Sequence, residues 1–376
     1  LKAGPTVGPV SDAQRFAGFS AGGDEKGVWG EVSVRDGEDY GATVEAYIGA
    51  DPESWTRQGS WRHAAALATY AATNTEVALG SSYCCAFRMT YEKDGETVVK
   101  WTSTNTVGVT GSVHWSGAAG DGRWTNAGNW KEGLVPTSLT SDYFSRSGTT
   151  VVKAGDEALY GRGVYVTQGT VIWDFTSGTA LTNTWLHFGE EGRTSATLIV
   201  SNGVINTTAV SSGNKGAPTF DSSNSTFELV GTRAKFGGFD SWKDHCVFHL
   251  LDGAYVEVDS ISIKNTGWSS QILIDQGSCL RVTGKDSGNL AVDGGSKVIV
   301  DGGAVTNWGS VQLSMSTDSS GSLFVRNGGV FAQRCTTDKS FAVGMRGKGR
   351  VFVAGTRFAV SVYEILANLW EEQCAD

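Results

Sequence analysis

The chain has 376 residues, of which 51 are glycine, 5 are proline and 13 are tryptophan, and 40% are apolar. This length fits two domains, and the composition excludes a collagen-like or a disordered chain, because glycine lacks a period of three and apolar residues are abundant. The net charge of −9 argues against nucleic acid or an anionic membrane as a partner, and the sequence has no apolar run long enough to predict a membrane span.

The first segment is expected to be all-β. Residues 1–12 are predicted to form an N-terminal tail and residues 13–112 a β-sandwich, because short apolar stretches alternate there with turn residues at the spacing typical of sandwich strands. Asp94-Gly95 lies between two of these stretches and predicts a two-residue hairpin turn.

A second feature of this segment is the order Leu79, Gly80 and Tyr83 ahead of an alternating apolar stretch. This order is typical of the tyrosine corner of sandwich domains. On these residues the segment resembles a fibronectin type III domain over about 100 residues, the size of such sandwiches.

Residues 113–145 are predicted to form a tryptophan-rich entry or cap module. Its ordered series is Trp115-Ser116-Gly117, Gly122-Arg123-Trp124, Asn129-Trp130, Gly133-Leu134-Val135-Pro136 and Asp142. The series resembles the opening module of large exported β-repeat proteins related to the autotransporter-associated β-strand repeats. The resemblance implies that a β-helix follows and that the chain is secreted or on the cell surface. Physically, the three tryptophans can cover the apolar end of a solenoid.

Residues 146–360 repeat one pattern: an apolar residue, any residue, a second apolar residue, two variable residues and a turn at Gly or Thr. The copies begin with Leu198/Val200, Phe227/Leu229, Phe248/Leu250, Ile272/Ile274, Val298/Val300, Leu323/Val325 and Val351/Val353, with earlier copies at Thr150/Val152 and Val164/Val166. Residues two apart on a strand share a face, so each apolar pair enters the core together. A period in the twenties therefore predicts a right-handed parallel β-solenoid, also called a β-helix.

The last residues, 361–376, are expected to form a helix that covers the final coil. Their apolar residues have helical spacing, and Ser361 with Glu364 has the spacing of a capping box. The apolar stripe consists of Val362, Ile365, Leu366, Leu369 and Trp370. The alternative is a mobile tail.

One charged cluster could be catalytic. It consists of His187, Glu190, Glu191 and Arg193, between two predicted coils. Carboxylates beside a base could serve glycoside hydrolysis or β-elimination on a polysaccharide. The alternative is a solvated, charged turn.

Four tryptophans of the repeats lie outside the predicted core positions and are candidate ligand-binding residues: Trp185, Trp242, Trp268 and Trp308. If they are exposed, their rings could stack on sugars along a groove. If they are buried, they fill corners of the coils.

Metal and cofactor sites are not predicted. Adjacent Cys84 and Cys85 point to opposite faces of a strand, so at most one is in the core, and the other four cysteines lack zinc-site spacing: Cys246, Cys279, Cys335 and Cys374. His245 and His249 lie four residues apart on an expected strand, which separates them too far for one metal. Free thiols and one or two disulfides both remain open.

Two functions fit these features. The first is a non-catalytic extracellular or cell-surface protein, structural or adhesive, that presents the elongated surface of the solenoid to an extracellular polysaccharide or another surface protein. The second is a polysaccharide-active enzyme, a lyase or glycoside hydrolase, or a carbohydrate-binding module that uses the solenoid groove. The lack of a familiar catalytic motif favours the first and leaves open whether the chain is an enzyme.

Overall fold

The structure is a computed structural model. It describes the chain apart from residues 1–13, 23–26, 35–42, 52, 54–55, 60, 65–68, 75–76, 103, 191–193, 208–217, 240–242, 264–268, 285–288, 335–339, 356, 362–363 and 368–376. The predicted N-terminal tail therefore lies outside the described residues. The chain divides into two compact units, Leu1–Gly111 and Ser112–Asp376, and each is described by itself.

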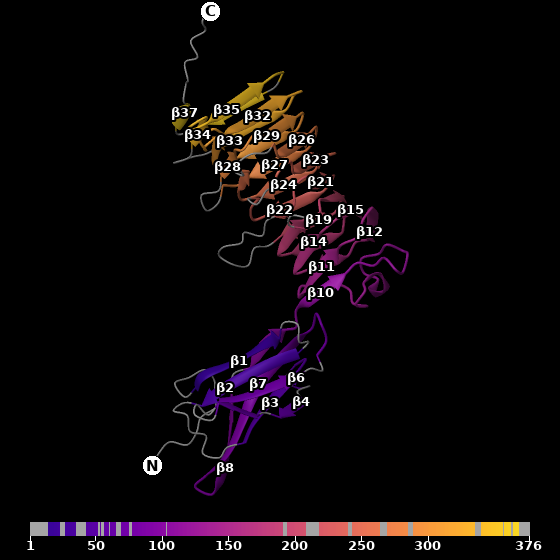
Figure 1. Ribbon diagram of the computed structural model, residues 1–376, viewed down its shortest axis with the longest axis vertical. Helices are drawn as coiled ribbons and strands as arrows, with labels where there is room; N and C mark the ends of the chain where they lie inside the picture. Colours follow the sequence, from indigo (N-terminus) through magenta and orange to yellow (C-terminus); the bar gives the residue numbers. More distant parts are fainter. Residues whose placement is uncertain are drawn as a thin grey trace, which may run out of the picture. The chain divides into compact units, whose positions relative to one another are not determined.

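Unit 1 consists of two antiparallel sheets (Figure 1). One has the order β1 (Gln14–Gly22), β2 (Gly27–Val34), β6 (Thr69–Asn74) and β5 (Trp61–Ala64). The other has the order β4 (Thr56–Gly59), β3 (Thr43–Gly49), β7 (Ser82–Lys93) and β8 (Glu96–Trp101), and β9 (Asn105–Gly108) also pairs with β7. Asp94 and Gly95 join β7 to β8 with φ values of 54° and 85°, so the predicted hairpin turn is confirmed.

Tyr83 ties the start of β7 to the preceding loop. The backbone N–H of Ala78 donates a hydrogen bond of 2.8 Å to the Tyr83 hydroxyl, the upstream bond expected of a tyrosine corner. The Tyr83 ring packs against a buried cluster that includes Ile48 and Cys85. Cys85 is buried and Cys84 only partly so, which confirms that one of the two is in the core.

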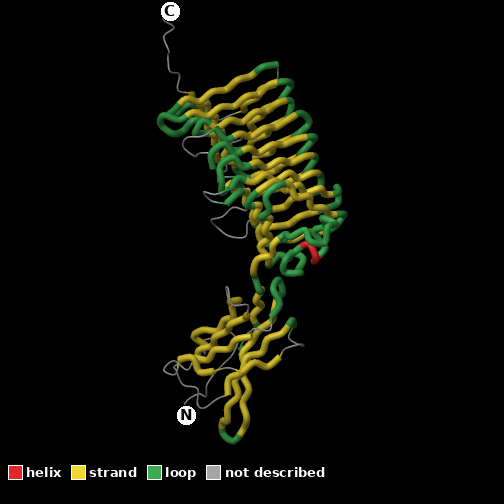
Figure 2. The backbone as a smooth tube through the Cα atoms, turned by 45° about the vertical axis from the view of Figure 1, so that its right-hand side comes forward, coloured by secondary structure: helices red, strands yellow, loops and turns green. Residues whose placement is uncertain are grey.

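Unit 2 opens with three buried tryptophans. Trp115, Trp124 and Trp130 are all at most 3% exposed. The Trp124 ring lies 5.7 Å from both Phe144 and Trp173 of the first coils, and Trp130 Nε1 donates to the Trp124 carbonyl at 2.9 Å. The three rings therefore cover the apolar end of the first coils. Beside them lies the 3-10 helix Ala127–Asn129 (Figure 2).

The rest of unit 2 is a parallel β-solenoid of about nine turns, stacked in Figure 2 like rungs. The first nine-stranded sheet contains β12 (Thr149–Ala154), β15 (Gly169–Phe175), β18 (Ala196–Ser201), β21 (Thr226–Val230), β23 (Val247–Leu251), β26 (Gln271–Asp275), β29 (Ser296–Asp301), β32 (Ser320–Arg326) and β35 (Lys348–Val353). The second contains β13 (Ala158–Tyr160), β16 (Ala180–Asn183), β19 (Val204–Thr207), β22 (Arg233–Phe236), β24 (Tyr255–Val258), β27 (Cys279–Val282), β30 (Ala304–Asn307), β33 (Val330–Arg334) and β36 (Arg357–Ser361).

Two five-stranded sheets complete the solenoid. One contains β10 (Gly111–His114), β11 (Thr140–Phe144), β14 (Gly163–Val166), β17 (Trp185–Phe188) and β20 (Pro218–Phe220). The other contains β25 (Ile261–Ile263), β28 (Asn289–Val292), β31 (Ser310–Leu313), β34 (Ser340–Val343) and β37 (Glu364–Ala367). Where the structure describes the chain, it has no helix long and apolar enough to cross a membrane.

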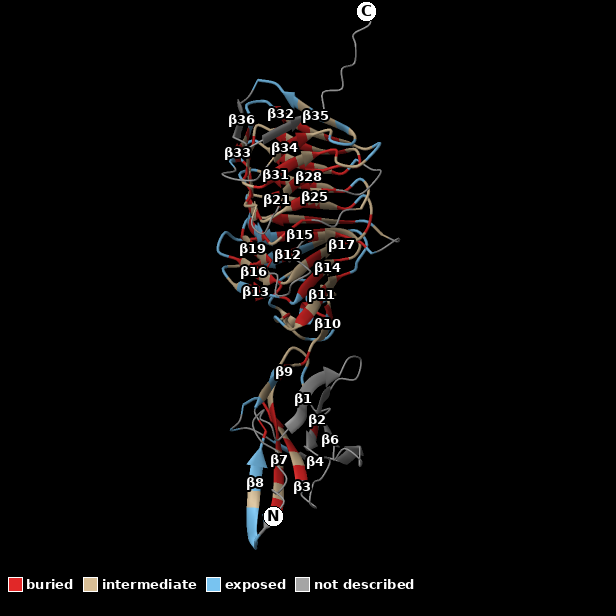
Figure 3. Ribbon diagram, turned by 90° about the vertical axis from the view of Figure 1, so that its left-hand side faces the viewer, coloured by how far each residue is buried: buried red, intermediate tan, exposed pale blue. Residues whose placement is uncertain are grey.

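The predicted apolar pairs form the solenoid core. From Leu198/Val200 to Leu323/Val325, every member is at most 1% exposed, and Figure 3 shows buried residues alternating along the strands. Successive pairs stack in register, with Val298 beside Leu323 and Val300 beside Val325. The last pair, Val351/Val353, lies on the terminal strand β35, where Val353 is 48% exposed.

One of the two early copies of the predicted repeat, Val164/Val166, is wrong, whereas Thr150/Val152 lies on β12 in register with β15. Val164 and Val166 are buried, but they lie on β14 of a five-stranded sheet. The matching pair on the first nine-stranded sheet is Val171/Trp173 of β15. The error arises because each coil has several inward-facing strands, and the alternation that marks a strand does not say which sheet it joins.

The end of the chain differs from the predicted helix. Glu364–Ala367 forms strand β37, with Ile365 opposite Phe341 and Leu366 opposite Ala342 of β34. Ser361 belongs to strand β36. Backbone pairing with the open edge of the last coil outweighs a helical stripe that has only a few residues to propagate it. The other residues of 361–376 lie outside the described parts.

Candidate functional site

Four aromatic rings form a column on the outward side of the sheet β10-β11-β14-β17. Tyr143, Tyr165 and His187 are register partners, and their neighbours on each strand are buried. The rings stack nearly parallel, with centroids 4.6 Å apart from Tyr143 to Tyr165 and 4.8 Å from Tyr165 to His187. His114 extends the stack at 5.2 Å from Tyr143. We call these four residues the ring ladder.

Trp185 adds a fifth ring beside the ladder. It lies over Gly163, where a Cβ would overlap the indole, so glycine is required for this close approach. Its Nε1 donates to the Tyr165 hydroxyl at 2.7 Å, and the Arg162 guanidinium lies 5.5 Å from its ring centroid, within cation–π range. Burial raises the pKa of Tyr165, so this phenol stays protonated at neutral pH.

A carboxylate binds the histidine at each end of the ring ladder. His187 Nδ1 lies 2.7 Å from Asp221, and His114 Nδ1 lies 2.7 Å from Glu132. Burial opposes ionisation of Glu132, but hydrogen bonds from the His114 ring and backbone outweigh it and lower its pKa. The two carboxylates therefore hold both imidazole rings in the stacking orientation.

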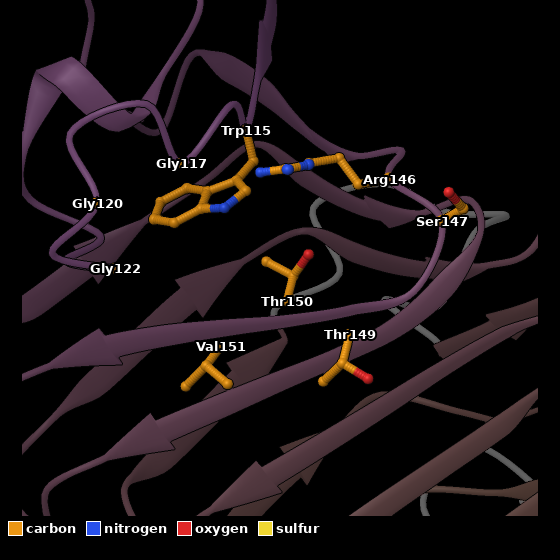
Figure 4. Close-up of a pocket in the computed structure, with 9 residues that line it drawn as sticks. All are labelled: Trp115, Gly117, Gly120, Gly122, Arg146, Ser147, Thr149, Thr150 and Val151. Atoms are coloured by element: carbon orange, nitrogen blue, oxygen red, sulfur yellow. The ribbon is translucent and has the colours of Figure 1, made fainter.

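Two cavities open at the His114 end. One of about 200 Å³ is lined by His114, Trp115, Ser116, Lys131, Tyr143, Ser145 and Arg146. The other, about 210 Å³, shares Trp115 and Arg146 and is drawn in Figure 4, with Thr149, Thr150 and Val151 of β12 on its opposite wall. Arg146 is fixed between them because its Nη1 donates to the Ser116 carbonyl at 2.6 Å. The first cavity is therefore lined both by the cationic side chains of Lys131 and Arg146 and by two members of the ring ladder, His114 and Tyr143.

A second charged cluster lies on the outward side of the first nine-stranded sheet. His249 Nε2 is 3.0 Å from Asp275, and His249 Nδ1 is 3.7 Å from Glu228. Sequence reasoning examined His249 only together with His245. Aligning the copies of the repeat would have revealed this cluster, because Glu228 and His249 each lie between the two apolar residues of successive copies.

The candidate residues from sequence are separated in the structure. Trp185 and His187 lie together at the ring ladder, whereas Trp308 lies elsewhere in the solenoid with the Arg281 guanidinium 4.6 Å from its ring centroid. Glu190 is exposed and forms an isolated bridge with Thr194. Trp242, Trp268, Glu191 and Arg193 lie outside the described residues. The sequence did not point to Asp221, which contacts His187, or to Tyr165 and Arg162, which contact Trp185.

The cysteines and histidines form no metal site in the described parts of the chain, where no group of three or more His, Cys, Asp and Glu side chains is placed to hold an ion. Cys84, Cys85, Cys246 and Cys279 are free thiols. Burial raises the pKa of Cys85 to about 12 and that of Cys246 to about 11, so both stay protonated at neutral pH. Cys335 and Cys374 are outside the described residues.

The fold defines an all-β chain with a parallel β-solenoid. Compared with protein-family models, curated proteins and solved structures, the chain matches none of them. The resemblances to fibronectin type III domains and to exported β-repeat proteins therefore stay predictions.

Proposed function

We propose that the chain is a non-catalytic, secreted or cell-surface adhesive protein that binds an acidic polysaccharide along the ring ladder. The ring ladder carries the proposal. It presents the polar edges of stacked rings at the rung spacing of a β-sheet, with a cavity lined by Lys131 and Arg146 at one end and Arg162 on Trp185. Aromatic rings with cations beside them suit sugars that carry carboxylate or sulfate groups.

The remaining architecture is part of the same proposal. We assign unit 1 to the fibronectin type III-like sandwiches, supported by the hydrogen bond from Ala78 to Tyr83 and by two antiparallel sheets. We assign the solenoid to the right-handed exported β-repeat type, supported by the burial of Trp115, Trp124 and Trp130 over its first coils. Both assignments favour an extracellular place for a polysaccharide partner.

Binding to uronate-containing and sulfated polysaccharides, with neutral glucans for comparison, tests this function. Trp185→Ala should weaken binding about tenfold, because a ring contact contributes about 1–1.5 kcal/mol and 1.4 kcal/mol is a factor of ten. Trp308→Ala is the matched control, since it also removes a half-buried tryptophan beneath an arginine. Lys131→Gln should weaken binding to acidic chains in low salt.

The proposal fails if acidic polysaccharides bind no better than neutral ones, or if Trp308→Ala weakens binding and Trp185→Ala does not. The second result would move the ligand to the Trp308 surface.

A second candidate function is a polysaccharide-active enzyme. The specific observation in its favour is the His187–Asp221 pair beside Trp185, since a carboxylate-bound histidine can act as a general base. Incubation with the same polysaccharides, followed by assays for new reducing ends and unsaturated products, distinguishes the two functions. Products that disappear in His187→Ala and persist in His249→Ala would establish the enzyme.

A further inference from the structure

The outward face of the first nine-stranded sheet carries one continuous column of side chains. Register partners run through all nine strands in the order Val151, Ile172, Ile199, Glu228, His249, Leu273, Ile299, Phe324 and Phe352. Their neighbours along most of these strands are buried, so these side chains point away from the core. We call these nine residues the outer column.

The outer column is apolar except at its centre. Seven of its nine positions are aliphatic or aromatic, and the rings of Phe324 and Phe352 stack at 4.5 Å. Val151 is 42% exposed at one end and Phe352 46% at the other. A contiguous apolar strip on the solvent face of a sheet marks an interaction surface, because parallel sheets are ordinarily covered on both faces.

The order of residues along the outer column indicates which partner would fit it. Glu228 and His249 are the fourth and fifth rungs, with three apolar rungs before them and four after. When a second copy faces the first with its solenoid axis reversed, rung four of each copy meets rung five of the other. Glu228 then lies opposite His249, and the apolar rungs meet one another: Ile199 with Leu273, Ile172 with Ile299, and Val151 with Phe324.

We propose that the outer column is the interface of an antiparallel homodimer. The neighbouring column on the same face agrees with this pairing, because it places Thr149 opposite Ser322, Thr170 opposite Lys297 and Thr197 opposite Gln271, with no like charges facing each other. A parallel pairing would instead place Glu228 opposite Glu228 of the other copy, which is repulsive. At the centre of the outer column, the reversed orientation therefore avoids a contact between two Glu228 side chains.

The size of the face is sufficient for a dimer. The eight rungs that pair, at a strand spacing of about 4.8 Å, extend about 35–40 Å, and three side-chain columns give a width of about 15–20 Å. The buried area is then about 600–800 Å² per copy, close to the roughly 800 Å² per partner of a standard stable interface. On the other edge of the face the same pairing places Asp174 opposite Asp301 and Lys153 opposite Arg326, where Arg326 already binds Asp301 of its own chain at 2.7 Å.

Mass measurement of the full chain by sedimentation or light scattering tests the proposal. A dimer is expected at tens of micromolar, and Phe324→Asp should weaken dimerisation by at least 100-fold. Val330→Asp is the matched control, because Val330 is an exposed apolar residue on β33 of the other nine-stranded sheet. Circular dichroism checks that both variants fold. Monomers of the unaltered chain at 100 µM would overturn the proposal, as would loss of the dimer in Val330→Asp alone.

Two further measurements test the orientation. Glu228→Lys should disrupt the dimer, whereas Glu228→Gln should not strengthen it, because no Glu228 faces another Glu228 in the antiparallel pairing. A short thiol cross-linker should join two copies of Thr226→Cys, which lies near the two-fold axis, and should leave Thr149→Cys as monomers, because its two copies lie about seven rungs apart. Equal cross-linking of both variants above the parent chain would contradict the antiparallel arrangement.

Discussion

Asp142 is a buried acid whose replacement should change how stability depends on pH. It points into the first coil from β11 and is 0% exposed. Thr140 Oγ1 donates to its Oδ1 at 2.8 Å, whereas its Oδ2 faces Gly161 and has no hydrogen-bond partner in the described structure. Burial raises the pKa of Asp142 well above its ordinary value, so folding favours the neutral acid over the carboxylate.

The sign and size of the effect follow from linkage. Because the folded pKa lies above the unfolded pKa of about 3.9, Asp142 contributes fully to stability below that pH, and this contribution is lost as pH rises towards the folded pKa. Within this interval the free energy of unfolding falls by about 1.4 kcal/mol per pH unit on account of this residue. Asp142→Asn keeps the shape and the acceptor for Thr140 but cannot ionise, so its stability curve should be flatter.

Urea unfolding followed by tryptophan fluorescence measures the difference, since Trp124 packs against Phe144 of the same strand. Asp301→Asn is the control with the opposite sign: hydrogen bonds from Asn327 and Arg326 lower the pKa of Asp301, so its contribution is lost as pH falls. Identical pH slopes in the parent chain and Asp142→Asn would refute the reasoning, as would an Asn variant clearly less stable at neutral pH.

Three other predictions concern the core, the corner of unit 1 and a buried thiol. Leu250→Ala should lower the free energy of unfolding by about 2–5 kcal/mol because it empties part of the solenoid core, whereas Val330→Ala at an exposed position should cost less than about 1 kcal/mol; equal losses in denaturant titrations would contradict this. Tyr83→Phe should destabilise unit 1 by about 1 kcal/mol, because the Ala78 N–H loses its acceptor, and an unchanged melting temperature would argue against the tyrosine corner. Cys246, whose pKa burial raises to about 11, should resist thiol reagents at pH 8 until the chain unfolds; rapid labelling of the folded protein at this position would show that it is accessible.

The core of the solenoid could be predicted from sequence because its residues follow two periods at once: the two-residue alternation of a strand and the spacing of the repeat copies. Alternation along a strand puts Val298 and Val300 on one face, and the spacing of the copies places Leu323 and Val325 above them. The hairpin at Asp94 could also be predicted, because its turn depends only on two neighbouring residues that tolerate positive φ. Such features depend on a few neighbouring residues and on burial.

What could not be predicted depends on the coil as a whole. Alternation fits any sheet of the coil, so Val164/Val166 fits the repeat pattern although it lies in a five-stranded sheet and the other copies lie in a nine-stranded one. The residues Glu364–Ala367 fit a helical stripe as well as a strand, and the open edge of β34 decides between them. In both cases the deciding partner lies in another part of the same coil or in the coil below.

The candidate site was found only in part for the same reason. Trp185 and His187 were chosen for their residue types, but the groups that make them a site come from neighbouring coils, with Asp221 34 residues from His187 and Tyr165 20 residues from Trp185. Tyr165 and His187 each lie between two buried apolar residues, so aligning these two segments would have brought them together, but Tyr143 follows Asp142 and does not fit that pattern.

Stacking in register turns each variable position of the repeat into a column on the surface. Most inward positions of the coils are apolar because they form the core, whereas an outward position can hold any residue unless neighbouring coils share a function there. The ring ladder repeats an aromatic at one such position over four strands, and the outer column repeats an apolar residue at another over seven of nine. A solvated position would vary without order from coil to coil. The persistence of one residue class across coils, on two different sheets, is therefore the physical ground for assigning a ligand to the first column and a second copy of the chain to the other.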